Sequence, residues 1–91
     1  MYSEKVILKN ATGLHARPGS NFAMKALNFK SSIFVSRSTE PEKKFNGKSL
    51  MKLLALGINQ GEEIVIEANG EDEKEAVKSL VEFINSGCGE E

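Results

Sequence analysis

The chain has 91 residues, 40% of them hydrophobic, and its 12 basic and 13 acidic side chains leave a formal net charge of −1. This length predicts a single domain over residues 1–91 with one small core. The balanced charge does not favour a nucleic-acid interface, and no apolar run reaches the roughly 20 residues of a membrane-spanning helix, so we expect no membrane insertion. One cysteine cannot form an internal disulfide, and the N-terminus lacks a signal peptide's apolar segment, so we expect a cytoplasmic protein.

The first half of the chain predicts a strand, a helix and two further strands. An apolar run predicts a buried strand over residues 5–10. Pro18 then suits the first position of a helix, because the missing N–H of proline is tolerated there, and helical spacing continues to about residue 28. We expect this helix to bury a face made of Phe22, Ala23, Ala26 and Leu27.

Strands then follow on either side of a polar loop. Residues 32–36 predict the second strand, residues 37–42 a hairpin loop and residues 43–46 a short third strand. Asn46-Gly47 is compatible with a two-residue hairpin turn, but we favour a loop because too few residues separate it from the next helical pattern.

The second half predicts a short apolar helix, a strand and a last helix. Ser49 is a good N-cap for the short helix, and Gly57 is well placed to end it. Residues 63–68 give the clearest strand. Asp72 can cap the last helix, whose apolar stripe contains Ala76, Val77, Leu80, Val81 and Ile84. We expect residues 86–91 to form a frayed tail with Cys88 exposed.

The predicted order β-α-β-β-α-β-α indicates an α+β fold. Such an order is typical of one four-stranded antiparallel sheet with three helices on one face.

His15, Arg17 and Pro18 form a compact candidate site for a phosphoryl group. The start of a helix attracts anions through its unpaired N–H groups and its partial positive charge. A neutral imidazole at His15 can attack phosphorus, and the phosphoramidate formed is labile, as a relay requires. The guanidinium of Arg17 can pair with phosphate oxygens. A single histidine near a helix start can also be an ordinary surface side chain, so this string alone indicates only an anion site.

Three segments resemble one known family. Residues 13–18, Gly-Leu-His-Ala-Arg-Pro, resemble the active-centre signature of the HPr family, the histidine-containing phosphocarriers of the bacterial phosphoenolpyruvate:sugar phosphotransferase system. Residues 48–58 resemble that family's regulatory serine segment, and residues 61–73 resemble its last strand and the start of its last helix. The three occur in the family's order. The resemblance implies an open-faced β-sandwich, in agreement with the order of elements above.

The resemblance also implies a role for each residue of the active centre. His15 would accept a phosphoryl group on Nδ1 from enzyme I and pass it to enzyme IIA components, as a carrier rather than a free-standing enzyme. Arg17 would position the phosphoryl group. The segment that we expect to line the phosphate site is Ala16, Pro18, Gly19 and Ser20. No cofactor is implied, and the chain offers no set of metal ligands.

Ser49 matches the serine that HPr kinase/phosphorylase modifies in many Gram-positive relatives. Phosphate there would add about −1.5 to −2 charges beside an apolar docking surface and repel acidic partner groups. That predicted surface consists of Leu50, Met51, Lys52 and Leu54. The alternative for Ser49 is a plain N-cap with no regulatory role.

Two other functions remain open at the level of the sequence. The chain could be a carbon-catabolite regulatory module that binds a LacI-type regulator through phospho-Ser49, although the presence of His15 argues against that as its only role. It could also carry phosphate in a dedicated, for instance nitrogen-related, relay with the same chemistry and different partners.

Overall fold

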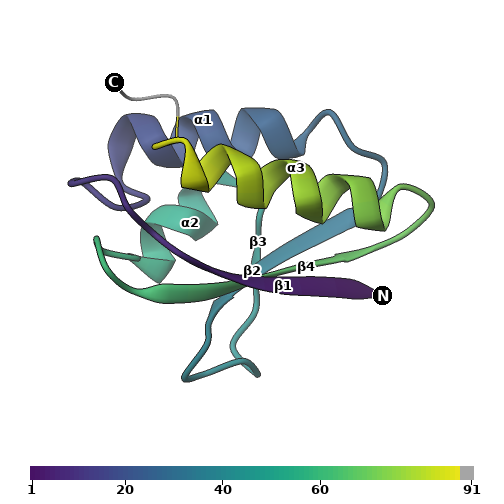
Figure 1. Cartoon of the computed structure of the whole chain (residues 1–91), viewed down its shortest axis with the longest axis horizontal. Coiled ribbons are helices and arrows are strands. Elements are labelled where there is room, and N and C mark those ends of the chain that lie inside the picture. Colours follow the sequence, from purple (N-terminus) through teal and green to yellow (C-terminus); the bar gives the residue numbers. More distant parts are fainter. Residues whose placement is uncertain (89–91) are drawn as a thin grey trace.

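The computed structural model describes residues 1–88 and confirms the predicted order of elements (Figure 1). The elements are β1 (Tyr2–Ile7), α1 (Ala16–Ala26), β2 (Ser32–Arg37), β3 (Phe45–Asn46), α2 (Leu50–Leu56), β4 (Glu63–Asn69) and α3 (Glu73–Asn85). None of the helices in this part of the chain is long and apolar enough to span a membrane.

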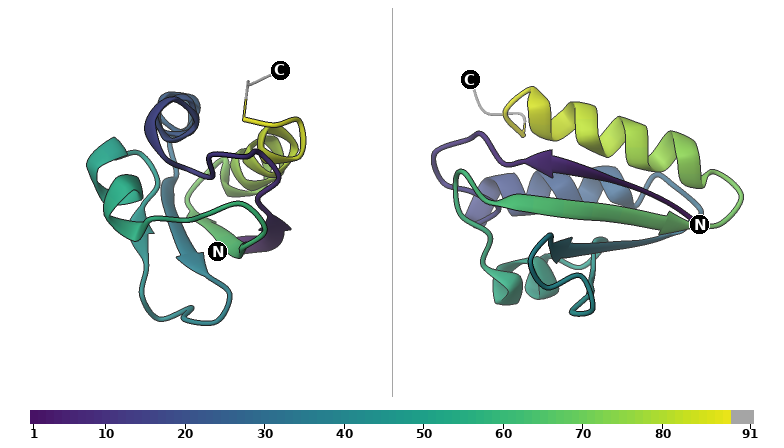
Figure 2. Two further views of the ribbon diagram at one scale, coloured as in Figure 1. Left: turned by 90° about the vertical axis from the view of Figure 1, so that its left-hand side faces the viewer. Right: turned by 60° about the horizontal axis from the view of Figure 1, so that its bottom comes forward.

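The strands form one four-stranded antiparallel sheet in the order β1-β4-β2-β3. β4 lies between β1 and β2. Its Ile64 pairs with Val6 of β1, and its Ile66 pairs with Val35 of β2. Alternate residues of β4 are buried, because successive side chains of a strand point to opposite faces. The helices gather over that buried face (Figure 2), so the predicted α+β arrangement is confirmed.

One hydrophobic core lies between the sheet and the helices. Its largest fully buried side chains are Phe22, Leu8, Leu14, Ile33, Leu53, Ile58, Ile64, Ile66, Leu80 and Ile84, together with Val35 and Val77. The predicted faces of α1 and α3 contribute as expected, except that Leu27 is 63% exposed. That prediction was wrong because α1 ends at Ala26 and Leu27 is its C-cap, where the helical spacing no longer applies.

Two strand boundaries differ from the prediction. β1 lies earlier than expected, ending at Ile7, although Leu8 remains buried and donates its N–H to the Glu62 carbonyl at 3.0 Å. β3 has only two residues, because Lys43 and Lys44 belong to the loop. The Asn46-Gly47 pair forms a loop, as favoured, with the Ser49 N–H donating to the Asn46 carbonyl.

The predicted caps of α2 are both confirmed. The Ser49 hydroxyl accepts the Lys52 N–H at 3.3 Å, and Gly57 ends the helix with a left-handed φ of 65°. Asp72 is the N-cap residue of α3, but its side chain does not cap that helix. The carboxylate instead accepts hydrogen bonds from Lys30 and Ser31.

The expectation of a frayed tail was wrong for residues 86–88. α3 ends in a Schellman motif, in which the Gly87 N–H donates to the Ile84 carbonyl and the Cys88 N–H to the Phe83 carbonyl. The Asn21 amide of α1 donates to the Cys88 carbonyl at 3.2 Å, and Cys88 is fully buried. Residues 89–91 of the predicted tail lie outside the described residues.

Candidate functional site

Two loops that lie together at one end of the sheet build the site (Figure 1). One connects β1 to α1, and the other connects α2 to β4. The Leu14 N–H donates to the Ile58 carbonyl at 3.0 Å, and the Gly61 N–H donates to the Leu8 carbonyl at 2.8 Å. These backbone hydrogen bonds fix one loop relative to the other.

Gly13 permits this close approach. Its φ is 65°, and a Cβ at this position would overlap the Ile58 carbonyl oxygen. The Asn10 side chain stabilises the turn by donating to the Gly13 carbonyl at 2.6 Å. The chain therefore enters α1 in one defined direction.

His15 is the N-cap of α1, with extended backbone angles of φ −96° and ψ 156°. We predicted Pro18 as the first residue of the helix. The helix instead begins at Ala16, so Pro18 is its third residue. Because the first N–H groups of a helix have no intrahelical acceptor, proline is tolerated throughout that turn and its position alone does not locate the start. Because α1 begins at Ala16, the His15 side chain lies directly at the N-terminal end of the helix, which attracts anions.

The imidazole of His15 is half-buried and bonded to one side chain. Its Nε2 lies 3.0 Å from Oδ1 of Asn59, which belongs to the α2–β4 loop. Among the described residues, the His15 side chain makes no capping hydrogen bond to α1. The ring is thus accessible, with one nitrogen engaged by the neighbouring loop.

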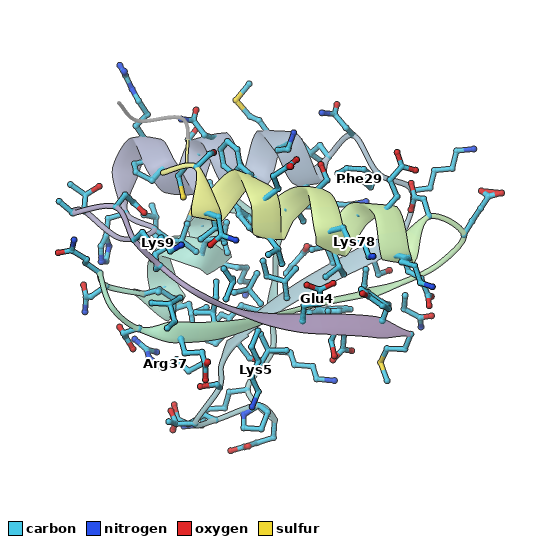
Figure 3. All side chains as sticks on the ribbon, in the orientation of Figure 1. Glu4, Lys5, Lys9, Phe29, Arg37 and Lys78 are labelled. Atoms are coloured by element: carbon cyan, nitrogen blue, oxygen red, sulfur yellow. The ribbon has the colours of Figure 1, made fainter. Side chains whose placement is uncertain are left out.

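The sequence did not predict a role for Asn59. Glu62 and Arg37 hold the loop that contains Asn59 in place. Its N–H donates to Glu62 Oε2 at 2.8 Å, while Arg37 Nε donates to Glu62 Oε1 at 2.7 Å and Arg37 also donates to the Gly57 carbonyl at 3.0 Å. The Arg37 guanidinium, assisted by the Asn59 N–H, lowers the pKa of Glu62, and the same ion pair raises the pKa of Arg37. Glu62 therefore accepts these hydrogen bonds as a carboxylate. Figure 3 labels Arg37, which lies toward the same end of the sheet as the α2–β4 loop.

The other residues predicted at the phosphate site differ in how far they are exposed. Arg17 is exposed and, within the described residues, its guanidinium makes no hydrogen bond or ion pair. Ser20 is half-buried, while Pro18 and Gly19 are buried. A Cβ on Gly19 would lie 2.6 Å from the Leu14 carbonyl oxygen and 3.3 Å from Leu50 Cδ1, so Gly19 leaves room chiefly for the backbone that leads into α1. The predicted role of the Ala16 side chain lies outside what the structure describes.

Of the four α2 residues predicted to form a docking surface, three are exposed and one packs partly against the core. Met51 is 78% exposed and Leu54 42% exposed, Lys52 is exposed, and Leu50 is half-buried against the core. On α1, Met24 is 64% exposed, which the sequence interpretation did not anticipate. Met24, Met51 and Leu54 are thus exposed apolar side chains of α1 and α2, and a docking role for α2 stays a prediction.

The chain matches the sequence profile of the PTS-HPr family, described as "PTS HPr component phosphorylation site", over residues 2–86. It is 37% identical over 90 residues to the phosphocarrier protein HPr of Neisseria meningitidis serogroup A, covering 99% of this chain and 98% of that protein. A crystal structure of HPr-C-His from Thermoanaerobacter tengcongensis is 44% identical, with a TM-score of 0.91 and coverage of 100% of this chain and 99% of the other.

Longer proteins contain a similar segment. The multiphosphoryl transfer protein of Haemophilus influenzae is 41% identical over 83 residues, which are 91% of this chain. This chain spans only 17% of that protein's length. Taken together, the family profile, the full-length relative and the shared fold show that the chain belongs to the HPr family of the phosphotransferase system.

Proposed function

We propose that this chain carries a phosphoryl group on His15, accepting it from phospho-enzyme I and passing it to enzyme IIA components of the sugar phosphotransferase system. The observation that supports this most strongly is the place of His15. His15 occupies the N-cap position of an eleven-residue helix, where partial positive charge favours an anion, and its ring is accessible. The predicted cytoplasmic location is part of the same proposal.

The transfer is a displacement at phosphorus. The lone pair of one imidazole nitrogen forms the new P–N bond while the bond between phosphorus and the donor breaks, and the reverse displacement hands the group to the acceptor. The first-turn N–H groups of α1 can donate to the equatorial oxygens, and the exposed guanidinium of Arg17, which has no partner among the described residues, can turn toward the same charge. Partner proteins supply the remaining groups.

The test is phosphoryl labelling with phosphoenolpyruvate and enzyme I. Wild type should acquire an acid-labile, alkali-stable phosphate, and His15→Ala should acquire none. Arg17→Ala should be labelled at least about tenfold more slowly, because a charge-assisted hydrogen bond contributes about 1.5–3 kcal/mol. Lys78→Ala, which removes an exposed charge from α3, is the matched control and should behave as wild type. An unlabelled wild type, or label that persists in His15→Ala, would reject the proposal.

A regulatory role for Ser49 is a second proposal. Ser49 is half-buried at the N-cap of α2, and exposed Met51 and Leu54 follow on the same helix. A phosphate on the hydroxyl would place charge beside this apolar surface and weaken docking of acidic partners.

Two substitutions separate charge from capping at Ser49. Ser49→Asp and Ser49→Asn are both good N-caps, but only the first adds charge. We expect Ser49→Asp to slow labelling of His15 by enzyme I while Ser49→Asn leaves it unchanged, and a kinase with ATP to phosphorylate wild type at Ser49. Equal rates in the two variants would exclude the charge mechanism.

A further inference from the structure

We propose that Asn59 is a positioning residue for phosphoryl transfer, holding the His15 ring with its proton on Nε2 so that the lone pair of Nδ1 is available to phosphorus. This inference rests on the proposed carrier function and adds a residue from a second loop to the site. It begins from the 3.0 Å contact between His15 Nε2 and Asn59 Oδ1.

The contact determines which ring nitrogen carries the proton. An amide oxygen can only accept a hydrogen bond, so the nitrogen facing it must donate. A neutral imidazole has one N–H, and donation from Nε2 therefore leaves Nδ1 unprotonated. Histidines in other proteins are oriented in the same way by an acceptor behind the ring.

The backbone next to both side chains holds the pair together. The hydrogen bond from the Leu14 N–H to the Ile58 carbonyl joins the residues that immediately precede His15 and Asn59. Since each side chain follows directly from this fixed point, the ring and the amide meet without a long flexible connection. The close approach at Gly13 reinforces the same junction.

The ion pair between Arg37 and Glu62 holds the backbone at Asn59. Glu62 Oε2 accepts the Asn59 N–H at 2.8 Å, and Arg37 bonds both Glu62 and the Gly57 carbonyl. The Arg37 and Glu62 side chains are 27% and 31% exposed, so this ion pair is less screened than one on the open surface. The loop around Asn59 is thereby fixed at residues 57, 59 and 62.

The arrangement lets the proton remain in place during transfer. As Nδ1 bonds to phosphorus and the donor bond breaks, the ring gains positive charge and keeps the hydrogen on Nε2. The Asn59 carbonyl dipole faces that charge and stabilises it. When the group leaves for the acceptor, the electron pair of the P–N bond returns to Nδ1 and the same tautomer is restored.

The tautomer can be measured without any partner protein. In protein labelled with ¹⁵N-histidine, at a pH where the ring is neutral, we expect a pyrrole-like Nε2 signal and a pyridine-like Nδ1 signal. Asn59→Ala should shift both signals toward a mixture of tautomers, whereas Asn59→Asp, which retains an acceptor oxygen, should keep the wild-type pattern. Gln60→Ala is the matched control, because Gln60 is in the same loop but donates to the Lys9 carbonyl.

The same variants are then assayed for labelling by enzyme I. Asn59→Ala should be labelled about fivefold more slowly, since a hydrogen bond of this kind contributes about 1 kcal/mol. Asn59→Asp should keep the tautomer yet also be slow, because its charge repels phosphate. Backbone amide spectra of each variant establish that it is folded.

A proton on Nδ1 in wild type would overturn the inference, as would an Asn59→Ala variant with wild-type tautomer and rate. A wild type that shows the expected tautomer but takes no phosphate from enzyme I would count against the carrier function instead. The two failures are therefore distinguishable.

Discussion

At the scale of single residues, Asp72 joins two parts of the chain. Its carboxylate accepts the Lys30 N–H at 2.9 Å, the Ser31 N–H at 2.9 Å and the Ser31 hydroxyl at 2.5 Å, which ties the start of β2 to the start of α3. These bonds, with the Ser31 hydroxyl first, lower the pKa of Asp72 to about 2. The charged form is thus favoured by folding.

The lowered pKa of Asp72 predicts acid sensitivity. Because the folded value lies below the ordinary 3.8, the contribution is present above about pH 4 and is lost as pH falls toward 2. Urea unfolding of wild type should show a free energy that decreases across this range, and Asp72→Asn should decrease less. Glu71→Gln is the control, since its ion pair with Lys30 is long and exposed, and it should follow wild type. Parallel curves for Asp72→Asn and wild type would refute the assignment.

The sequence predicts His15 and Arg17 as site residues, but it does not predict Asn59, which contacts the His15 ring, or Arg37, which holds the loop of Asn59. The histidine was recognisable because its neighbours in sequence favour a helix start. Asn59 and Arg37 carry no local signal, because their roles depend on contacts 44 and 20 positions apart. Such contacts exist only once β4 has placed the α2–β4 loop beside the β1–α1 loop.

At the scale of elements, two glycines with the same backbone angle have different surroundings. Gly13 and Gly57 both have a φ of 65°. A Cβ on Gly57 would lie 3.8 Å from the Leu54 carbonyl oxygen, an ordinary contact, whereas one on Gly13 would overlap the Ile58 carbonyl oxygen. Gly57 is therefore required only for its conformation, and Gly13 also for space.

This difference predicts unequal costs of adding one methyl group. Gly57→Ala should reduce the free energy of unfolding by about 1 kcal/mol, the cost of a left-handed alanine. Gly13→Ala should reduce it by clearly more and should shift the His15 ring signals, because the loops must separate. Urea unfolding and NMR of both variants check this. Similar losses would mean that the loops are not in close contact at Gly13.

Elements with local end signals were predicted well from the sequence. α2 has a serine that caps its first turn and a glycine that ends it, so both boundaries agreed. α1 was placed two residues late because proline is allowed at several positions of a first turn. The exposure of Leu27 and the short β3 depend on where neighbouring elements end, which spacing alone does not determine.

At the scale of the whole molecule, the end of α3 is tied to the rest of the fold. Cys88 is fully buried, its N–H is bonded to Phe83, and its carbonyl accepts from Asn21 of α1. The Lys25 ammonium also lies 5.7 Å from the centre of the Phe83 ring, a second contact between the two helices. Residues 86–88, which local composition marked as part of a tail, instead contact α1 through Cys88, which only the tertiary structure could reveal.

The burial of Cys88 predicts slow modification of its thiol. In the native protein, Ellman's reagent should react at least about tenfold more slowly than in guanidinium, because the thiol must first be exposed by local opening. The matched control is the double variant Cys88→Ala, Ser86→Cys, whose thiol at an exposed position should react at once when folded. Equally fast reaction of native wild type would show that residues 86–88 do not pack as described.

The proposed carrier role of His15 is tested most directly by NMR. Protein labelled with ¹⁵N-histidine is phosphorylated with phosphoenolpyruvate and enzyme I, and coupling between ³¹P and ¹⁵N is recorded. We expect phosphorus bonded to Nδ1 of His15, with Nε2 still carrying hydrogen. Phosphorus on Nε2, on another residue or on none would contradict a site built from the N-terminus of α1 and the amide of Asn59.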